Sequence, residues 1–351
     1  MSKNKDPQKR EKWFYPETFE VRVDNLVRRA EIVKSLREFF DKNGYVEVET
    51  PALQISPGLE SSLRAMETSL TEPNGDQLSI YLHSSPEFAM KKLLAAGMKR
   101  IFQICHVYRD GERSRIHHPE FTMLEWYKVG ANWRNILEEG IELIRTVCGS
   151  EARQGDRICD LSATWEYMSV PEAFERFAKI DILQTMSSPM EPDTEALRFA
   201  AEAIGLRTAV SDGWDDVFFR IFLEKVEPNL GITVPTILHS YPASMAALSK
   251  ISEEDHRLSE RFEIFICGME LANGYEELTD SLEQRTRFVN SLKQRNSRGL
   301  PAYPIDEDFI LALENGIPDC AGIALGLDRL VMLAAGADRI TEVLWAPVSG
   351  G

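Results

Sequence analysis

The sequence predicts an α+β fold, because helical and strand periodicities both recur along its 351 residues. Three observations support this prediction. An amphipathic helical pattern precedes a strand between residues 24 and 50, a strand pattern begins at His118 after a partner strand that ends in Arg109, and several helical patterns lie between residues 131 and 230. Hydrophobic residues make up 43% of the chain and charged residues 27%, so a sizeable core is available.

The chain begins with a polar lead-in of about 20 residues, anchored by the aromatic residues at 13–15. A helix is predicted from Asp24, a suitable N-cap, with apolar side chains at helical spacing as far as Phe40. Asn43 and Gly44 indicate its C-terminal end. The predicted strand YVEVET follows and meets Pro51.

A short strand is predicted at residues 81–82, and a helix follows whose first turn contains Pro86 and Glu87. Four helical patterns then occur between residues 131 and 230, separated by runs of Pro, Gly and Ser. They are Trp133 to Val147, Val170 to Ala178, Thr194 to Ile204, and Asp215 to Val226.

The central hairpin, residues 109–127, combines a cation, aromatic rings and carboxylates. If His118 onward is a strand, its period of two places four side chains on one face, namely Phe121, Met123, Glu125 and Tyr127. This face could stack on a base and hold a cationic substrate, while Arg109 could meet a phosphate. An amphipathic hairpin with a charged turn is the alternative.

Composition limits the classes of function. No apolar run approaches the length of a membrane span, and the lysine-rich start has no apolar signal segment, so a cytoplasmic protein is expected. The five cysteines are widely spaced without a CxxC pair, and the six histidines form no HExxH motif, which disfavours thiolate and zinc chemistry. Neither a GxxxxGK[ST] loop nor a GxGxxG loop is present.

The formal net charge of −16 disfavours bulk binding of nucleic acid, which depends on clustered cations. One basic cluster, Lys91, Lys92, Lys99 and Arg100, is a candidate patch, although solvated surface is the expected role of these residues.

Three segments resemble the motifs of one enzyme family, in the expected order. PEFTMLEWY (119–127), after a strand ending in Arg109, resembles motif 2 of class II aminoacyl-tRNA synthetases of the lysyl type. GIALGLDRLVML (322–333) resembles motif 3, with its arginine at Arg329, and GYVEVETPAL (44–53) resembles motif 1. The resemblance implies a single catalytic domain over residues 1–351, with an antiparallel sheet flanked by helices and a helical insertion at about 131–230.

Motif 1 in this family builds a dimer interface, so the resemblance also implies a homodimer. A helix and strand inside a monomer core are the alternative. An N-terminal OB-fold is not expected, because only about 25 residues precede motif 1, too few for a five-stranded barrel.

The resemblance implies ATP as a substrate and assigns residues to it. Arg109 would contact the α-phosphate and Arg329 the far phosphates, with Phe121 and Arg329 on either side of the adenine. The full implied ATP site is Arg109, Asp110, Gly111, Glu112, His117, His118, Phe121, Glu270, Leu271, Gly326 and Arg329. The sequence itself suits this chemistry, because adenylate formation needs positioned cations and no protein nucleophile.

Glu263, Glu270 and Glu277 recur at intervals of seven. They are either solvated charges or, given their apolar neighbours, buried carboxylates that need counter-ions. The resemblance assigns Glu263 and Glu270 to Mg²⁺, a hard cation that prefers oxygen ligands. It also implies an acidic pocket for a lysine-like substrate, formed by Ser85, Pro86, Glu87, Glu125, Tyr127, Asn273, Glu277 and Ala324.

Two positions depart from the lysyl pattern. Where motif 2 usually has a glutamate two places after its arginine, this chain has Gly111, and we expect Glu112 to take over its contact near the adenine amino group. At the middle glycine of motif 3 stands Ala324, whose methyl group should disfavour an α-amine and favour an amine displaced along the chain.

With the absent anticodon domain, Ala324 makes the chain resemble the lysyl-tRNA synthetase paralogues that attach (R)-β-lysine to a lysine of translation elongation factor P. That resemblance implies β-lysyl adenylate formation followed by transfer to the protein, without stable tRNA binding. Two alternatives remain open. One is a lysyl-tRNA synthetase type of enzyme that charges tRNA, and the other is a catalytically silent regulatory paralogue.

Overall fold

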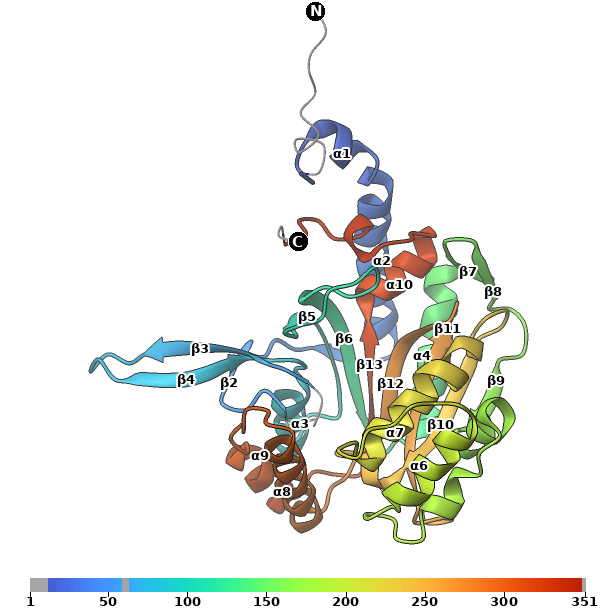
Figure 1. The fold of residues 1–351 in the computed structure, drawn as a ribbon. Coiled ribbons are helices and arrows are strands. Elements are labelled where there is room, and N and C mark those ends of the chain that lie inside the picture. The colour runs from blue at the N-terminus through green and yellow to red at the C-terminus, as the bar shows by residue number, and fades with distance from the viewer. Residues whose placement is uncertain (1–11, 59–62, 349–351) are drawn as a thin grey trace, which may run out of the picture.

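The fold is built on an eight-stranded sheet, seen in the computed structural model of Figure 1, which describes residues 12–58 and 63–348. The strand order is β1-β5-β6-β13-β12-β11-β10-β9. Their bounds are β1 Val46–Glu47, β5 Arg100–Tyr108, β6 Glu120–Val129, β13 Cys320–Gly326, β12 Met269–Glu276, β11 Leu258–Ile266, β10 Thr236–Pro242 and β9 Glu166–Ser169. The α+β prediction is confirmed.

The sheet is mostly antiparallel, as predicted, with one parallel pair at each edge. The six strands from β5 to β10 are mutually antiparallel, whereas β1 pairs parallel with β5 and β9 pairs parallel with β10. Both parallel strands lie at edges of the sheet and are reached by connections that contain helices, as a parallel pair requires.

Three helices cover one face of the sheet. These are α2 Val23–Lys42, α4 Trp133–Cys148 and α10 Leu327–Ala335, which contact one another and the central strands. Side chains such as Phe40, Leu143 and Leu330 join strand residues such as Trp126 and Ile323 in the largest apolar cluster. Because this face is covered by helices, the other face of the central strands is left for the site.

The predicted N-terminal helix is confirmed as α2, which ends before Asn43 and is followed by Gly44 at a positive φ of 72°. Its apolar residues do not all face the core, because Ala30 is exposed whereas Ile32 is buried in the core. A short helix, α1 Pro16–Glu20, precedes it. The predicted strand at 45–50 is limited to β1, and residues 1–11 of the predicted lead-in lie outside the described residues.

A separate three-stranded sheet projects from the main body, at the left of Figure 1. It consists of β2 Leu53–Gln54, β3 Met66–Thr71 and β4 Gln77–Leu82. The predicted short strand at 81–82 is the end of β4, which leads into α3 Glu87–Ala95 at the predicted place.

The segment 131–230 contains all four predicted helical regions, but it is not only helical. After α4 come the hairpin β7 Glu151–Gln154 and β8 Arg157–Asp160, and then β9 of the main sheet. The helices are α5 Val170–Ala173 with its continuation Phe174–Ala178, α6 Thr194–Ala203, and α7 Trp214–Ile221 with its continuation Phe222–Val226; short helical segments are Ile182–Thr185 and Glu227–Asn229. Phe218 of α7 packs in one apolar cluster with Leu238 and Phe265 of the sheet, so this segment shares a core with β10 and β11.

Two further helices, α8 Ser281–Ser297 and α9 Glu307–Glu314, were not predicted. Phe288 and Phe309 pack against Phe88 of α3, next to the end of the sheet that contains Tyr127. Short helical segments also occur at Ala243–Met245 and Ile340–Glu342. None of the helices formed by the described residues combines the length and apolar character needed to cross a membrane.

Candidate functional site

The strand register places the predicted site residues in rows across the open face of the sheet. Directly paired residues point to the same side, so each row is a line of neighbouring side chains. The first row is Glu125, Ala324, Asn273 and Glu263, on β6, β13, β12 and β11. The second row is Tyr127, Gly322, Tyr275 and Arg261, on the same strands. The predicted shared face of Glu125 and Tyr127 on β6 is thereby confirmed.

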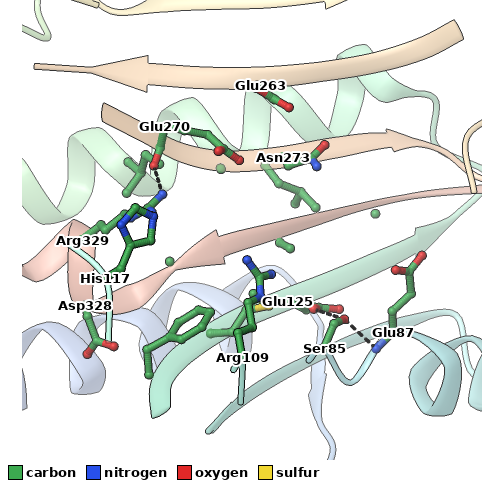
Figure 2. A pocket seen from close by; sticks show the side chains of 18 of the residues that line it. Ser85, Glu87, Arg109, His117, Glu125, Glu263, Glu270, Asn273, Asp328 and Arg329 are labelled. Atoms are coloured by element: carbon green, nitrogen blue, oxygen red, sulfur yellow. Dashed lines mark hydrogen bonds between the residues drawn. The ribbon is translucent and has the colours of Figure 1, made fainter. Parts of the chain in front are cut away.

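These rows form the floor of a cavity of about 380 Å³, shown in Figure 2. The predicted site residues that line it are Ser85, Glu87, Arg109, Glu112, His117, His118, Phe121, Glu125, Tyr127, Glu263, Glu270, Leu271, Asn273, Glu277, Ala324, Gly326 and Arg329. Pro86, Asp110 and Gly111 were also predicted but do not line it. Pro86 is the N-cap of α3, and Gly111 has a positive φ of 80°, which belongs to a turn. Because a side chain at that position would be strained, the glutamate one place later is the one that reaches the cavity.

One end of the cavity is an acidic pocket. Glu125 accepts hydrogen bonds from Ser85 Oγ at 2.6 Å and from the Tyr127 hydroxyl at 2.9 Å. Burial, with the nearby charge of Glu87, nevertheless raises the pKa of Glu125 to about 8. Glu277 is also buried, and burial raises its pKa to about 8. The pocket therefore favours a ligand that brings positive charge.

Lys91 is buried against two carboxylates of this acidic pocket, which corrects the predicted basic patch. Its ammonium group is 2.5 Å from Glu87 Oε1 and also pairs with Glu277. Lys92 pairs with Asp306 at 2.6 Å. Only Lys99 and Arg100 of the predicted patch are exposed as expected. The four cations thus do not form one surface.

The opposite end of the cavity presents two arginines. The guanidinium of Arg109 lies 5.2 Å from the ring centroid of Phe121 and 3.9 Å from the Glu112 carboxylate. Its Nε is buried without a hydrogen-bond partner among the described residues. A buried donor of this kind is costly unless a ligand oxygen accepts from it.

Arg329 is held by two contacts from opposite sides. Its Nη1 donates to the Glu270 carbonyl oxygen at 2.6 Å, and its Nη2 lies 2.7 Å from His117 Nε2. Burial and the charge of Arg329 lower the pKa of His117 to about 4, so the imidazole is neutral at pH 7 and accepts from the guanidinium. His118 already has a hydrogen-bond partner in the protein, since its Nε2 accepts a hydrogen bond from the Val348 amide at 3.1 Å.

The acidic pair Glu263 and Glu270 occupies the sheet between the two ends. A bulge in the β11–β12 pairing sets Phe265 opposite Glu270 and Ile264 opposite Ala272, so Glu270 and the extra residue Leu271 both line the cavity. Burial and Glu270 raise the pKa of Glu263 to about 7, although Arg261 pairs with it at 2.7 Å.

This pair fits Mg²⁺, because a buried and a half-buried carboxylate that repel each other gain from a divalent cation between them. Among residues 12–58 and 63–348, no group of three His, Cys, Asp or Glu side chains could hold a metal alone. An ion at this place would therefore also need oxygen atoms from a bound phosphate.

Asp328 fixes the motif 3 helix to α2 and to the motif 2 strand. It pairs with the buried Arg29 of α2 and accepts from the Thr122 amide of β6 at 2.6 Å. Arg29 also donates to Thr122 Oγ1 at 2.8 Å. Because the buried Arg29 and Asp328 satisfy each other's hydrogen bonds, they fix the start of the helix. Arg329, the next residue, is thereby held in place over the cavity.

Sequence reasoning missed several lining residues. Arg261 and Tyr275 lie two residues from Glu263 and Asn273, so strand periodicity could have found them if the hairpin had been recognised. Its turn is Cys267-Gly268, with positive φ at both positions, and this pair is a weak turn signal. Phe219 of α7 also lines the cavity, and no local signal marks it.

The comparisons with known proteins point to one family. The family model for class II tRNA synthetases (D, K and N) matches residues 13–349. The elongation factor P (R)-β-lysine ligase of Proteus mirabilis is 41% identical over 329 residues, which cover 93% of this chain and 95% of that protein. The ligases of the same name from Pectobacterium atrosepticum and Salmonella arizonae are 41% and 40% identical, each over 92% of this chain and 94% of theirs.

Proposed function

The chain belongs to the class II tRNA synthetases of the D, K and N group, and from that premise we propose that it is an ATP-dependent ligase for elongation factor P. It activates (R)-β-lysine as an adenylate and transfers it to a lysine side chain of that factor. The observation that carries the proposal is the cavity itself, where a buried acidic pocket adjoins two arginines, in a chain about 40% identical to ligases of that name. Because its acceptor is a translation factor, we place the reaction in the cytoplasm.

In the first step, a carboxylate oxygen of β-lysine attacks the α-phosphorus of ATP, and the bond from that phosphorus to the bridging oxygen breaks, releasing pyrophosphate. Arg109, with its buried unsatisfied Nε, would contact the α-phosphate, and Arg329 the departing phosphates. Phe121 and Arg329 would hold the adenine. Glu112 lines the same end of the cavity, where the adenine amino group would lie.

In the second step, the neutral amine of the acceptor lysine attacks the acyl carbon. A C–N bond forms, the bond from the acyl carbon to the AMP oxygen breaks, and the amine loses a proton. No protein nucleophile takes part, so the work of the protein is to position the reactants and stabilise the phosphate charge.

Glu263 and Glu270 would hold Mg²⁺, together with phosphate oxygens of ATP. When bound, the ion supplies positive charge that stabilises the transferred and departing phosphates. Glu87, Glu125 and Glu277 would hold the amines of β-lysine, with Tyr127 and Asn273 beside them. The row register supports this arrangement, because Glu125, Ala324 and Asn273 are direct neighbours.

Labelled substrates test the proposed function. With ATP and labelled (R)-β-lysine, we expect label on recombinant elongation factor P that survives RNase. The tRNA-charging alternative predicts instead acid-precipitable label, from lysine and total tRNA, that RNase removes. A silent paralogue would show no substrate-dependent ATP–pyrophosphate exchange with lysine, β-lysine or ornithine.

The methyl group of Ala324 is proposed to select the β-amine. It stands between Glu125 and Asn273, so it would face the substrate carbon that carries the amine. We expect Ala324→Gly to raise activation of α-lysine relative to (R)-β-lysine by roughly ten- to a hundredfold, the effect of one methylene-sized contact. ATP–pyrophosphate exchange with each amino acid, in both proteins, measures this ratio.

The matched control is Ala321→Gly, the same change on the opposite face of β13, where the side chain lies in the apolar core. It should lower stability without changing the preference. An unchanged ratio in Ala324→Gly would make Ala324 a neutral strand residue, and the tRNA-charging alternative would then deserve nearly equal weight.

The protein is proposed to be a homodimer that pairs through the motif 1 unit, which consists of helix α2 and strand β1. Val23 and Val27 of α2 and Val46 of β1 are exposed apolar residues of this unit, and β1 is an edge strand of the main sheet. We expect a solution mass near twice the chain mass of 39.9 kDa, measured by light scattering. Val27→Asp should weaken the dimer and Leu311→Asp, at an exposed site on α9, should not. A monomeric wild-type protein at micromolar concentration would contradict the motif 1 interface.

A further inference from the structure

We propose that Lys91 is a positioning residue that sets the charge of the acidic pocket, so that the pocket matches a substrate with two ammonium groups. This inference rests on the proposed function and adds to it the source of the specificity for diamino acids. Three carboxylates face the pocket, those of Glu87, Glu125 and Glu277, and Lys91 offsets one of them. The formal excess of two negative charges equals the two positive charges on the amines of (R)-β-lysine.

The surroundings of Lys91 suit a buried ammonium group. Its side chain is 3% exposed, and its Nζ lies between Glu87 on its own helix and Glu277 beyond the end of β12. The same Nζ is 5.3 Å from the ring centroid of Tyr275 and 5.9 Å from that of Phe309. Two carboxylates and two aromatic faces are the partners that a desolvated ammonium group requires.

The charge of Lys91 also favours the ionised form of the pocket carboxyls. Burial alone would lower the pKa of Lys91, but the charges of Glu277 and Glu87 outweigh it and raise the pKa, so the ammonium persists at neutral pH. In return, Lys91 opposes the effect of burial on Glu277 and Glu125, whose pKa values burial raises to about 8. The titratable and aromatic groups that face this region are Glu87 of α3, Glu125 and Tyr127 of β6, Tyr275 of β12, Glu277, Cys320 of β13 and Phe309 of α9.

The sign of the effect follows from these contacts. Without the Lys91 ammonium, the pKa values of Glu277 and Glu125 rise further, so protons occupy the carboxylates over a wider pH range. Substrate ammonium groups then compete with those protons. The loss of affinity is therefore largest at low pH and becomes smaller as the pH approaches the new pKa values.

The test compares Lys91→Met and Lys91→Gln with wild type and with Lys92→Met. Lys92 is the next residue on α3 and pairs with Asp306 outside the cavity, so its variant controls for loss of a charge on this helix. If methionine is not tolerated in the core, glutamine can still donate to Glu87 or Glu277. ATP–pyrophosphate exchange with (R)-β-lysine is measured from pH 6.5 to 9, with thermal unfolding of each variant.

We expect the neutral variants to lose about 10- to 100-fold in kcat/KM for (R)-β-lysine at pH 7, as a pKa rise of one to two units would produce. The KM for ATP should stay within about twofold, and the defect should shrink by pH 9. Lys91→Arg retains the charge and should keep the wild-type pH profile.

A defect that is constant with pH, or equal for ATP and the amino acid, would overturn the role of Lys91 and leave it a packing residue. Isothermal titration calorimetry with (R)-β-lysine over the same pH range compares the affinities of wild type and the Lys91 variants without turnover. A protein that binds the diamino acid with the predicted pH dependence but shows no exchange would therefore refute the ligase and not the Lys91 inference.

Discussion

Arg109→Ala should reduce ATP–pyrophosphate exchange with (R)-β-lysine by about 10²- to 10³-fold, the usual cost of removing one charge-stabilising donor at a reacting centre. The side chain lies against Phe121 with a buried Nε that no described residue satisfies. Arg329 cannot replace it, because its own guanidinium is held by the Glu270 carbonyl and His117. The loss should appear in kcat, since the contact strengthens as the phosphate charge develops.

Arg115→Ala is the matched control, because Arg115 is on the same connection between β5 and β6 but is exposed and pairs with Asp338. It should keep exchange close to the wild-type rate. Retention of exchange within about tenfold in Arg109→Ala, or roughly 1.4 kcal/mol of barrier, would mean that this arginine does not contact the reacting phosphate. Arg109→Lys should recover part of the rate, as a point charge without the bidentate donor geometry.

The central strands were the part of the fold that the sequence predicted best. Strand periodicity placed Glu125 and Tyr127 on one face of β6, and the register joins this face to Ala324 and Gly322 of β13. Such predictions succeed because the side-chain period of a strand is a local property. The parallel edge strands could not be predicted in the same way, since the pairing of β1 with β5 depends on chain segments more than 50 residues apart.

Lys91 shows why charge clusters in a sequence are poor guides to surfaces. Lys91 and Lys92 are adjacent, but neighbouring residues on a helix point in different directions, so Lys91 pairs with Glu277 of the acidic pocket and Lys92 pairs with Asp306 outside the cavity. The spacing of four between Glu87 and Lys91 was a readable sign of a helical ion pair. The burial of that pair depends on β12 and α9, which the sequence around Lys91 does not reveal.

The hairpins that were missed have a different explanation. The turn of the β3–β4 hairpin contains Asn74-Gly75, which is a strong hairpin signal. Strand β3, however, is mostly polar and exposed, and only the last residues of β4 are buried, so the sequence predicted a strand only at the end of β4. In the β11–β12 hairpin both strands mix apolar and charged residues, and the turn residues Cys267 and Gly268 gave too little contrast to divide them.

Gly322→Ala should abolish amine binding, because the site has no room for a β-carbon at that position. A methyl group there would lie 2.3 Å from the Tyr127 ring and 2.7 Å from Glu277 Oε1, both well inside contact distance. Tyr127 is packed in the core and cannot move away cheaply. We expect kcat/KM for (R)-β-lysine to fall by more than about 100-fold, as a displacement of the amine-binding groups by about 1 Å would cause.

Gly326→Ala is the matched comparison on the same strand face. The nearest neighbour of a methyl group there would be the side chain of Arg329, at 3.6 to 3.8 Å, which is ordinary contact. The variant should therefore unfold at nearly the wild-type temperature. Any change in kinetics should be in the KM for ATP, since Gly326 lies toward the arginine end of the cavity. Exchange kinetics with each substrate varied separately distinguish the two variants. Two outcomes would contradict this prediction: Gly322→Ala could raise only the KM for ATP, or it could leave β-lysine activation within about tenfold of wild type, roughly 1.4 kcal/mol. Either result would mean that the amine does not bind between Tyr127 and Glu277, and the acidic pocket would then need another ligand.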